Sequence, residues 1–410
     1  MCRTRVRIDE RGAGVGGLAI GKKFRHGTHR TATPAETVDR VRPLLASMGI
    51  TRLANVTGLD VLGIPVVMAC RPNSRGLAVA QGKGLTVDAA KASAAMESIE
   101  SYHAENVVLP MLLRSHDELH RSDGVPDLDR LAATTGVTVD PDRRMLWVSG
   151  RDLLTEARIW VPFDLVHLDF TAEQRVMAPA FPVTSTGLAS GNHHLEAVSH
   201  ALTELIERDA AARWHDADPP ARDATRLDLD TVDDPDGRRL VEAVIAAGMR
   251  LTVHDLTSHF GVSVFRCEIV EDPRRGPQAI CSAGGYGCHP DRDIALSRAI
   301  TEAAQSRLTL IAGSRDDTFR PEYQAARDHD ALTARWDQAD GGGMRPFLDV
   351  PTSVNETFDD DLTMLLHRLR EGGAVQVVVV DLTQERFGLP VVRAVVPGLR
   401  QRPHDRPANP

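Results

Sequence analysis

Three segments of this sequence carry the same pattern of acidic and polar residues. In each, an alanine lies seven residues before a glutamate, a polar residue lies four before it, and a second Glu or Gln lies three after it. The three glutamates are Glu97, Glu204 and Glu302. Spacings of three, four and seven residues place side chains on one face of an α-helix. We therefore predict three helices that each present acidic groups on one face.

The residues around these acids indicate that the helices are buried on most sides. A single helix with Glu-x-x-Glu is usually solvent-exposed at that face. Here the pattern recurs three times, and buried carboxylates repel one another unless a cation or hydrogen-bond donors lie between them. The neighbouring positions are small or apolar: Ala94, Ala95 and Met96; Ala197, Val198, Ala201 and Leu202; Ala299, Ile300, Ala303 and Ala304.

The composition of the three faces favours a bound polyanion over a metal cage. The faces contain Ser93, Glu97 and Glu100; Asn192, Glu196, His200, Glu204 and Glu207; and Arg298, Glu302 and Gln305. This asymmetric set suits Mg²⁺ on the carboxylates, with amides and cations on phosphate oxygens. Six basic residues are available for phosphate contact, although each alone is more often a surface charge: Arg30, Arg71, Arg75, Lys83, Arg208 and Arg307.

Composition excludes several classes of protein. A net charge of −9 over 410 residues argues against a nucleic-acid binder. Five scattered cysteines indicate a reducing compartment, and Cys281 and Cys288 are interpreted as half-buried thiols beside a loop. No apolar run reaches the roughly 20 residues that cross a bilayer, and Met1–Asp9 lacks an apolar signal-peptide core. We expect a cytoplasmic protein without a membrane partner.

Helical and strand-like patterns alternate without regular βαβ order, which predicts an α+β fold. Small-residue turns are predicted at Ser185–Gly191 and Gly284–Gly287. The glycines at 12, 14 and 17 match a dinucleotide motif, and Gly16–Lys22 nearly matches a P-loop. Neither follows a strand or opens an apolar helix, so residues 1–26 are interpreted as a flexible Gly- and Arg-rich arm.

These motifs resemble the YcaO family. The matching residues are Ser93-x-x-x-Glu97-x-x-Glu100, Asn192-x-x-x-Glu196, Glu204-x-x-Glu207-Arg208 and Arg298-x-x-x-Glu302-x-x-Gln305, with the turn Gly82-Lys83-Gly84 before the first. The resemblance implies a YcaO-type α+β fold, with three carboxylate-bearing helices packed on mixed β-sheet around an ATP site. It covers residues 27–399 as one catalytic domain and leaves 400–410 as a Pro- and Arg-rich tail.

The resemblance also implies the site and its cofactors, ATP and Mg²⁺. The expected Mg²⁺ ligands are Glu97, Glu100, Glu196, Glu204 and Glu207. The expected ATP-binding residues are Arg30, Thr37, Lys83, Ser93, Glu97, Asn192, Glu204, Arg208, Arg298, Glu302 and Gln305. No residue stands out as a general base, so no catalytic residue is assigned.

The family's chemistry is ATP-dependent phosphorylation of a peptide backbone amide after a nucleophile adds to it, in the maturation of ribosomally made peptides. The tail, Pro403–Pro410, lacks the Pro-x-Pro-x-Pro ending of azoline-forming members, and the Gly27–Arg30 and Pro34–Thr37 segments resemble members that act with a TfuA-type partner. The resemblance therefore favours thioamide formation on a precursor peptide with a TfuA-like or other leader-binding partner. Family members are often dimers, so a homodimer is compatible with it.

Three alternatives remain open. The first is an azoline-forming cyclodehydratase that acts on Cys, Ser or Thr of a precursor peptide. The second is a metal-only enzyme, and the third is a non-catalytic scaffold that keeps the fold. His200, Glu204 and Glu207 alone match a helical metal site. The sequence does not identify the substrate peptide or the nucleophile.

Overall fold

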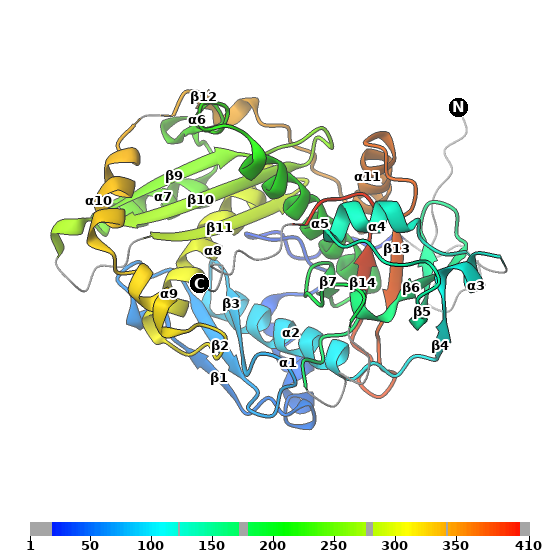
Figure 1. The fold of residues 1–410 in the computed structure, drawn as a ribbon. Coiled ribbons are helices and arrows are strands. Elements are labelled where there is room, and N and C mark those ends of the chain that lie inside the picture. The colour runs from blue at the N-terminus through cyan, green and yellow to red at the C-terminus, as the bar shows by residue number, and fades with distance from the viewer. Residues whose placement is uncertain (1–18, 122–123, 172–178, 276–281, 342, 402–410) are drawn as a thin grey trace.

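A computed structural model describes residues 19–121, 124–171, 179–275, 282–341 and 343–401. Helices and several β-sheets are intermixed along the chain, so the α+β prediction is confirmed (Figure 1). The strand pairs are antiparallel, except that β8 (Leu227–Asp228) pairs in parallel with β12 (Arg345–Pro346). No helix of the described segments is long and apolar enough to span a bilayer.

The first acidic helix belongs to an N-terminal unit built on a three-stranded sheet. Helix α2 (Val87–Glu105) follows the last strand and packs back on it, with α1 (Pro34–Val41) beside it. Thr86 caps α2 by accepting a hydrogen bond from the backbone N–H of Ala89. The strands, in sheet order, are β1 (Arg52–Asn55), β2 (Val66–Cys70) and β3 (Val79–Lys83).

The third acidic helix belongs to a second unit of the same construction. Helix α8 (Arg292–Ala312) follows the last strand of a three-stranded sheet and packs back on it, while α7 (Pro235–Ala246) packs against α8. The strands are β9 (Met249–Asp255), β10 (Ser263–Glu271) and β11 (Ser282–His289). We refer to these two parts as the α2 unit and the α8 unit.

The predicted turn at Gly284–Gly287 is wrong, because these residues lie in strand β11. The turn predicted at Gly82-Lys83-Gly84 is wrong over Gly82 and Lys83, which end strand β3. A side chain on Gly82 would overlap the backbone of Ala94, and one on Gly285 would overlap the backbone of Ala303. These glycines let the helix backbone approach the strand closely. Cys288, expected to be half-buried beside a loop, is fully buried in β11.

The second acidic helix, α5 (His194–Asp216), lies between the α8 unit and a six-stranded sheet (Figure 1). The predicted turn before α5 is wrong over Leu188–Ser190, because these residues form strand β7 and pair with β14. Helix α11 (Phe358–Glu371) packs on α5. The other strands of the sheet are β4 (Met111–Arg114), β5 (Met145–Asp152), β6 (Arg158–Pro162), β13 (Val378–Asp381) and β14 (Val391–Val395).

Shorter helices lie outside these units. They are α3 (His116–His120), α4 (Leu128–Thr135), α6 (Pro219–Asp223), α9 (Arg320–Ala325) and α10 (His329–Gln338). The glycine motif at 12, 14 and 17, Cys281 and residues 402–410 fall outside the described residues. Lys22, the lysine of the near P-loop match, is buried and its Nζ lies 2.6 Å from Asp361 Oδ2, so it is not presented to a phosphate.

Candidate functional site

The acidic faces of α2, α5 and α8 converge on one cluster of side chains, and we refer to this cluster as the recess. Burial raises the pKa of Glu97 on α2 to about 7, and the charges of Glu302 on α8 and Glu204 on α5 raise it further. Glu97 as a whole residue is nevertheless exposed to solvent. The three helices that the sequence pattern predicted therefore place their acids close enough to repel one another.

On α8, the carboxylate is neutralised by the protein itself. Glu302 Oε2 lies 2.8 Å from Lys83 Nζ, which projects from β3 of the α2 unit. Its other oxygen accepts a hydrogen bond of 3.1 Å from the backbone N–H of Tyr286. Although burial opposes ionisation, Lys83 and Arg208 hold the pKa of Glu302 below its usual range.

On α5, Arg208 partly neutralises two carboxylates. Its Nη2 lies 3.7 Å from Glu204 Oε1 and 4.0 Å from Glu207 Oε1. The other oxygen of Glu204 accepts a hydrogen bond of 3.1 Å from Gly187 N–H. Burial of Glu207 outweighs the effect of Arg208 and raises the pKa of Glu207 to about 7.

On α2, Glu97 and Glu100 form no ion pair with a cation among the described residues. Glu100 Oε1 accepts hydrogen bonds from the backbone N–H of Ser190 at 2.8 Å and from its hydroxyl at 2.6 Å. Burial nevertheless raises the pKa of Glu100 to about 8, and the charge of Glu97 raises it further. Ser93, one turn before Glu97 on the same helix, is half-buried.

The segment before α1 closes another side of the recess. Thr31 donates to Glu196 Oε2 from its backbone N–H at 3.0 Å and from its hydroxyl at 2.9 Å, and Arg30 Nε lies 3.4 Å from Glu196 Oε1. Asn192 donates a hydrogen bond of 2.9 Å to the hydroxyl of Thr37. Glu196 thus has protein donors on both oxygens and would have to exchange one of them to bind a metal ion.

The recess contains carboxylates without a paired cation and buried polar atoms without a hydrogen-bond partner. Glu97, Glu100 and Glu207 have raised pKa values, and Glu97 and Glu100 form no ion pair with a described residue. Arg298 Nε and Gln305 Oε1 are buried and have no hydrogen-bond partner among the described residues. In the same part of the chain, no three His, Cys, Asp or Glu side chains could hold a metal ion by themselves. The residues therefore fit a cation that arrives together with an anionic ligand, rather than a metal ion held by protein groups alone.

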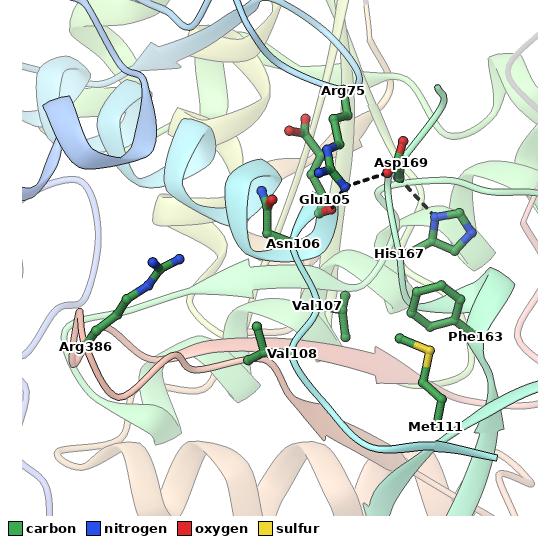
Figure 2. A pocket seen from close by; sticks show the side chains of 10 residues that line it. All are labelled: Arg75, Glu105, Asn106, Val107, Val108, Met111, Phe163, His167, Asp169 and Arg386. Atoms are coloured by element: carbon green, nitrogen blue, oxygen red, sulfur yellow. Dashed lines mark hydrogen bonds and ion pairs between the residues drawn. The ribbon is translucent and has the colours of Figure 1, made fainter. Parts of the chain in front are cut away.

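Three of the arginines proposed for phosphate contact are engaged elsewhere, so their predicted availability is wrong. Arg71 is buried in a two-bond ion pair with Glu105, and Arg307 lies 2.8 Å from Asp60 and from Glu271. Arg75 pairs with Asp169 at 2.8 Å, at the edge of a cavity of about 340 Å³ near the C-terminal end of α2 (Figure 2). None of the predicted ATP or Mg²⁺ residues lines this cavity. Figure 2 labels its walls as Arg75, Glu105, Asn106, Val107, Val108, Met111, Phe163, His167, Asp169 and Arg386.

Some residues of the recess were not found from the sequence. Thr31 and Ser190 donate to the carboxylates, and the backbone N–H of Gly187 and of Tyr286 do the same. Thr31 and Ser190 lie outside the three helices, so no helical spacing pointed to them. Gly187 and Tyr286 donate through their backbone N–H groups, which nearly every residue has, so their side chains could not indicate this role.

Comparison with known protein families identifies the family of this chain. The family model described as "YcaO cyclodehydratase, ATP- and Mg²⁺-binding" matches residues 81–400. The chain belongs to the YcaO family. An uncharacterized protein in the tfuA 3' region of Rhizobium leguminosarum bv. trifolii is 39% identical over 377 residues, which cover 90% of this chain and 88% of that protein.

Solved structures support the fold of this YcaO protein. A heterocyclase in complex with substrate and cofactor has a TM-score of 0.75 at 21% identity, covering 95% of this chain; the chain spans 55% of that heterocyclase. YcaO from Methanopyrus kandleri, bound with AMPPCP and Mg²⁺, has a TM-score of 0.71 at 24% identity, covering 93% of this chain and 94% of the other. The predicted fold is confirmed, and so are ATP and Mg²⁺ as the cofactors of the family.

Proposed function

We propose that this protein uses ATP and Mg²⁺ to phosphorylate a backbone amide oxygen of a ribosomally made precursor peptide. The observation that carries the proposal is the recess where α2, α5 and α8 meet. There Glu97 and Glu100 form no ion pair with a described residue, the Nε donor of Arg298 is buried without an acceptor, and the Oε1 acceptor of Gln305 is buried without a donor. A magnesium-bound polyphosphate supplies both the positive charge and the acceptor oxygens that these groups need.

Within this proposal, the predicted residues take different roles. The Mg²⁺ residues are Glu97, Glu100, Glu196, Glu204 and Glu207. The phosphate-binding groups are cations and amides: Arg30, Lys83, Asn192, Arg208, Arg298 and Gln305. Thr37 orients the Asn192 amide through their hydrogen bond. Glu302 holds Lys83 in place, and Ser93 lies one turn from Glu97 on the same helix face.

The bound nucleotide supplies a phosphoryl group that turns the amide oxygen into a good leaving group. The protein's own contribution is to hold the reacting groups in a fixed recess whose charges need little rearrangement. Helices α2 and α5 both pack against strand β7, so the fold sets the relative positions of the acids that they carry.

We propose thioamide formation as the outcome, with external sulfide as the nucleophile and a TfuA-like partner protein. The relative from the tfuA 3' region supports this choice, because it matches this chain over nearly its whole length. Azoline formation is the second candidate, supported by the heterocyclase with a similar fold. In that case a Cys, Ser or Thr side chain of the substrate replaces sulfide.

The deciding experiment is mass spectrometry of a candidate precursor peptide after co-expression with this protein and a TfuA-like partner. Thioamide formation exchanges one oxygen for sulfur, whereas azoline formation removes one water. A peptide that stays unmodified while the partner and sulfide are supplied, and ATP remains uncleaved, would favour a scaffold that keeps the fold. Tight binding of Zn²⁺ or Fe²⁺ without nucleotide affinity would favour a metal-only enzyme.

A further inference from the structure

The cavity of about 340 Å³ near the C-terminal end of α2 continues into a second hollow. The second has a volume of about 260 Å³, and both have Arg75, Glu105 and Asn106 in their walls. We refer to the two hollows together as the trough. Two adjoining hollows with shared walls form an elongated depression, which suits a single extended chain better than the flat surface of a folded partner.

Most of the charges that line the larger hollow are neutralised. Arg75 pairs with Asp169 at 2.8 Å, and Glu105 is neutralised by its buried arginine partner. Burial lowers the pKa of His167, so this imidazole is neutral near pH 7. Arg386 is left as the one charged side chain of this hollow that forms no ion pair with a described residue. The hollow therefore presents one unpaired positive charge.

The guanidinium of Arg386 is held in place by neutral groups. Its Nε and Nη2 donate hydrogen bonds of 3.0 Å and 2.8 Å to Oε1 of Gln384, and Nη2 also donates to the hydroxyl of Tyr102 at 3.0 Å. Its Cζ lies 4.5 Å from the ring centre of Phe387. Gln384 is only 4% exposed and donates a hydrogen bond of 2.9 Å to the backbone carbonyl of Asn106. An arginine oriented by uncharged groups keeps its positive charge available for an anionic ligand.

The wall of the hollow near this cation is apolar and partly open to solvent. Val108 is 69% exposed and Met111 is 38% exposed, and Val107 and Phe163 line the same hollow. Figure 2 shows Arg386 across the hollow from Phe163. Apolar side chains beside one unpaired cation are complementary to a peptide segment in which an acidic residue stands next to apolar residues.

We propose that the trough binds an extended segment of the precursor peptide, with the carboxylate of an acidic residue on Arg386 and apolar neighbours on Val108 and Met111. This inference rests on the proposed function, because it takes the substrate to be a peptide. The trough and the recess share helix α2, on which Glu97 and Glu105 are about 12 Å apart along the axis. An extended chain advances about 3.3 Å per residue, so the acidic residue lies roughly four or more residues from the amide that is modified.

The test measures the binding of three synthetic peptides to the full-length protein by isothermal titration calorimetry. The peptides are acetyl-Ala-Leu-Glu-Leu-Ala-amide and its analogues with Gln or Lys at the centre, so that the central residue carries the only charge. The variants are Arg386→Gln and Arg386→Glu. The control is Arg370→Gln, which alters an arginine that is exposed on α11 and lines neither hollow.

An ion pair whose partners stay partly exposed changes an affinity by roughly two- to five-fold. We expect the wild type to bind the Glu peptide more tightly than the Gln peptide by that factor, and Arg386→Gln to bind the two equally. Arg386→Glu should prefer the Lys peptide, a reversal that a merely structural role of Arg386 would not produce. The Arg370→Gln control should keep the preference of the wild type.

Equal affinity of the wild type for the Glu and Gln peptides overturns the inference, as does a preference for the Glu peptide that persists in both Arg386 variants. If Arg386→Glu does not fold, Arg386→Gln decides. A TfuA-like partner that binds the wild type but not Arg386→Glu, while the peptides are bound equally, identifies the trough as a partner surface and also overturns the inference.

Titration of AMPPCP with Mg²⁺ into the same proteins keeps the proposed function separate, because the Arg386 variants should bind this nucleotide like the wild type. A wild type that binds the nucleotide but does not distinguish the peptides leaves the proposed function standing without the trough. A wild type that distinguishes the peptides but binds no nucleotide overturns the proposed function and leaves the trough as a peptide site.

Discussion

The α2 unit and the α8 unit are built alike and charged differently. Each has a three-stranded antiparallel sheet followed by a helix that packs on a glycine of the last strand. On α8, Glu302 receives Lys83 from the other unit and keeps a low pKa. On α2, Glu97 and Glu100 receive no cation and have raised pKa values. The same sequence pattern thus places Glu302 in an ion pair between the two units and leaves Glu97 and Glu100 without a cation.

The largest expected effect comes from Glu97→Gln. Removing a ligand of a catalytic metal costs several kcal/mol of transition-state stabilisation, so we expect turnover to fall roughly 10³-fold. Stability of the ligand-free protein should hold or rise, because a repelling charge is removed. ATP turnover and thermal unfolding of the same sample check both parts. The control is Asp88→Asn on the same helix, where the carboxylate is exposed and paired with Lys91. A Glu97→Gln protein with normal turnover would break the comparison.

Lys83→Met tests whether the ion pair of Glu302 on α8 stabilises the protein. It leaves Glu302 buried beside Arg208 without its closest cation, so both stability and nucleotide affinity should fall. Breaking a half-buried ion pair of this kind costs on the order of 1–3 kcal/mol. Chemical denaturation and nucleotide titration measure the two losses. The double variant Lys83→Met/Glu302→Gln should recover part of the stability but not the affinity. Recovery of both would mean that Lys83 serves only Glu302.

Gly82→Ala and Gly285→Ala test whether the two units share their construction. Each added methyl group meets helix backbone, so each variant should lose about 1–3 kcal/mol of unfolding free energy. Gly284→Ala is the matched control, because its nearest non-neighbouring atom would lie at 3.7 Å, an ordinary contact. Equal losses at Gly82 and Gly285 support the shared construction. A control variant as unstable as the other two would refute the packing argument.

The smallest expected effect is a pH dependence of stability that has opposite signs for the acids of α2 and α5 and for Glu302 on α8. Glu97, Glu100 and Glu207 have folded pKa values of about 7, about 8 and about 7. Their contribution to stability is complete below the unfolded pKa near 4.5 and is lost as pH rises through the folded values. Glu302 works the other way and loses its contribution only as pH falls below the usual Glu range.

The melting temperature of the ligand-free protein should therefore decrease by roughly a few °C between about pH 5.5 and about pH 8.5. Glu207→Gln should flatten this slope, since it removes the most buried of the three groups, and Mg²⁺ with AMPPCP should flatten it in the wild type. A slope that Mg²⁺ with AMPPCP leaves unchanged would show that these acids are not the ligands of the bound nucleotide.

The helices could be predicted from the sequence because a helical period repeats locally. Glu97, Glu204 and Glu302 were placed on helices by spacing alone, and all three lie in the recess. The strands around them were less visible. Gly284–Gly287 was predicted as a turn because glycine favours turns, but tertiary packing against α8 decides its role.

The partners of the acids were not predictable, because they come from distant parts of the chain. Ser190 reaches Glu100 from β7, and Thr31 reaches Glu196 from the segment before α1. Arg71 and Arg307 resembled phosphate contacts in the sequence, yet both are neutralised by buried carboxylates.

The central claim is that the acids of α2 and α5 bind a nucleotide through Mg²⁺. The most direct measurement is calorimetric titration of AMPPCP into the protein with Mg²⁺ and, separately, with EDTA, repeated for Glu204→Gln. We predict binding that requires Mg²⁺ and is lost in Glu204→Gln. Equal affinity for AMPPCP in EDTA, or full Mg²⁺-dependent binding by Glu204→Gln, would contradict the account.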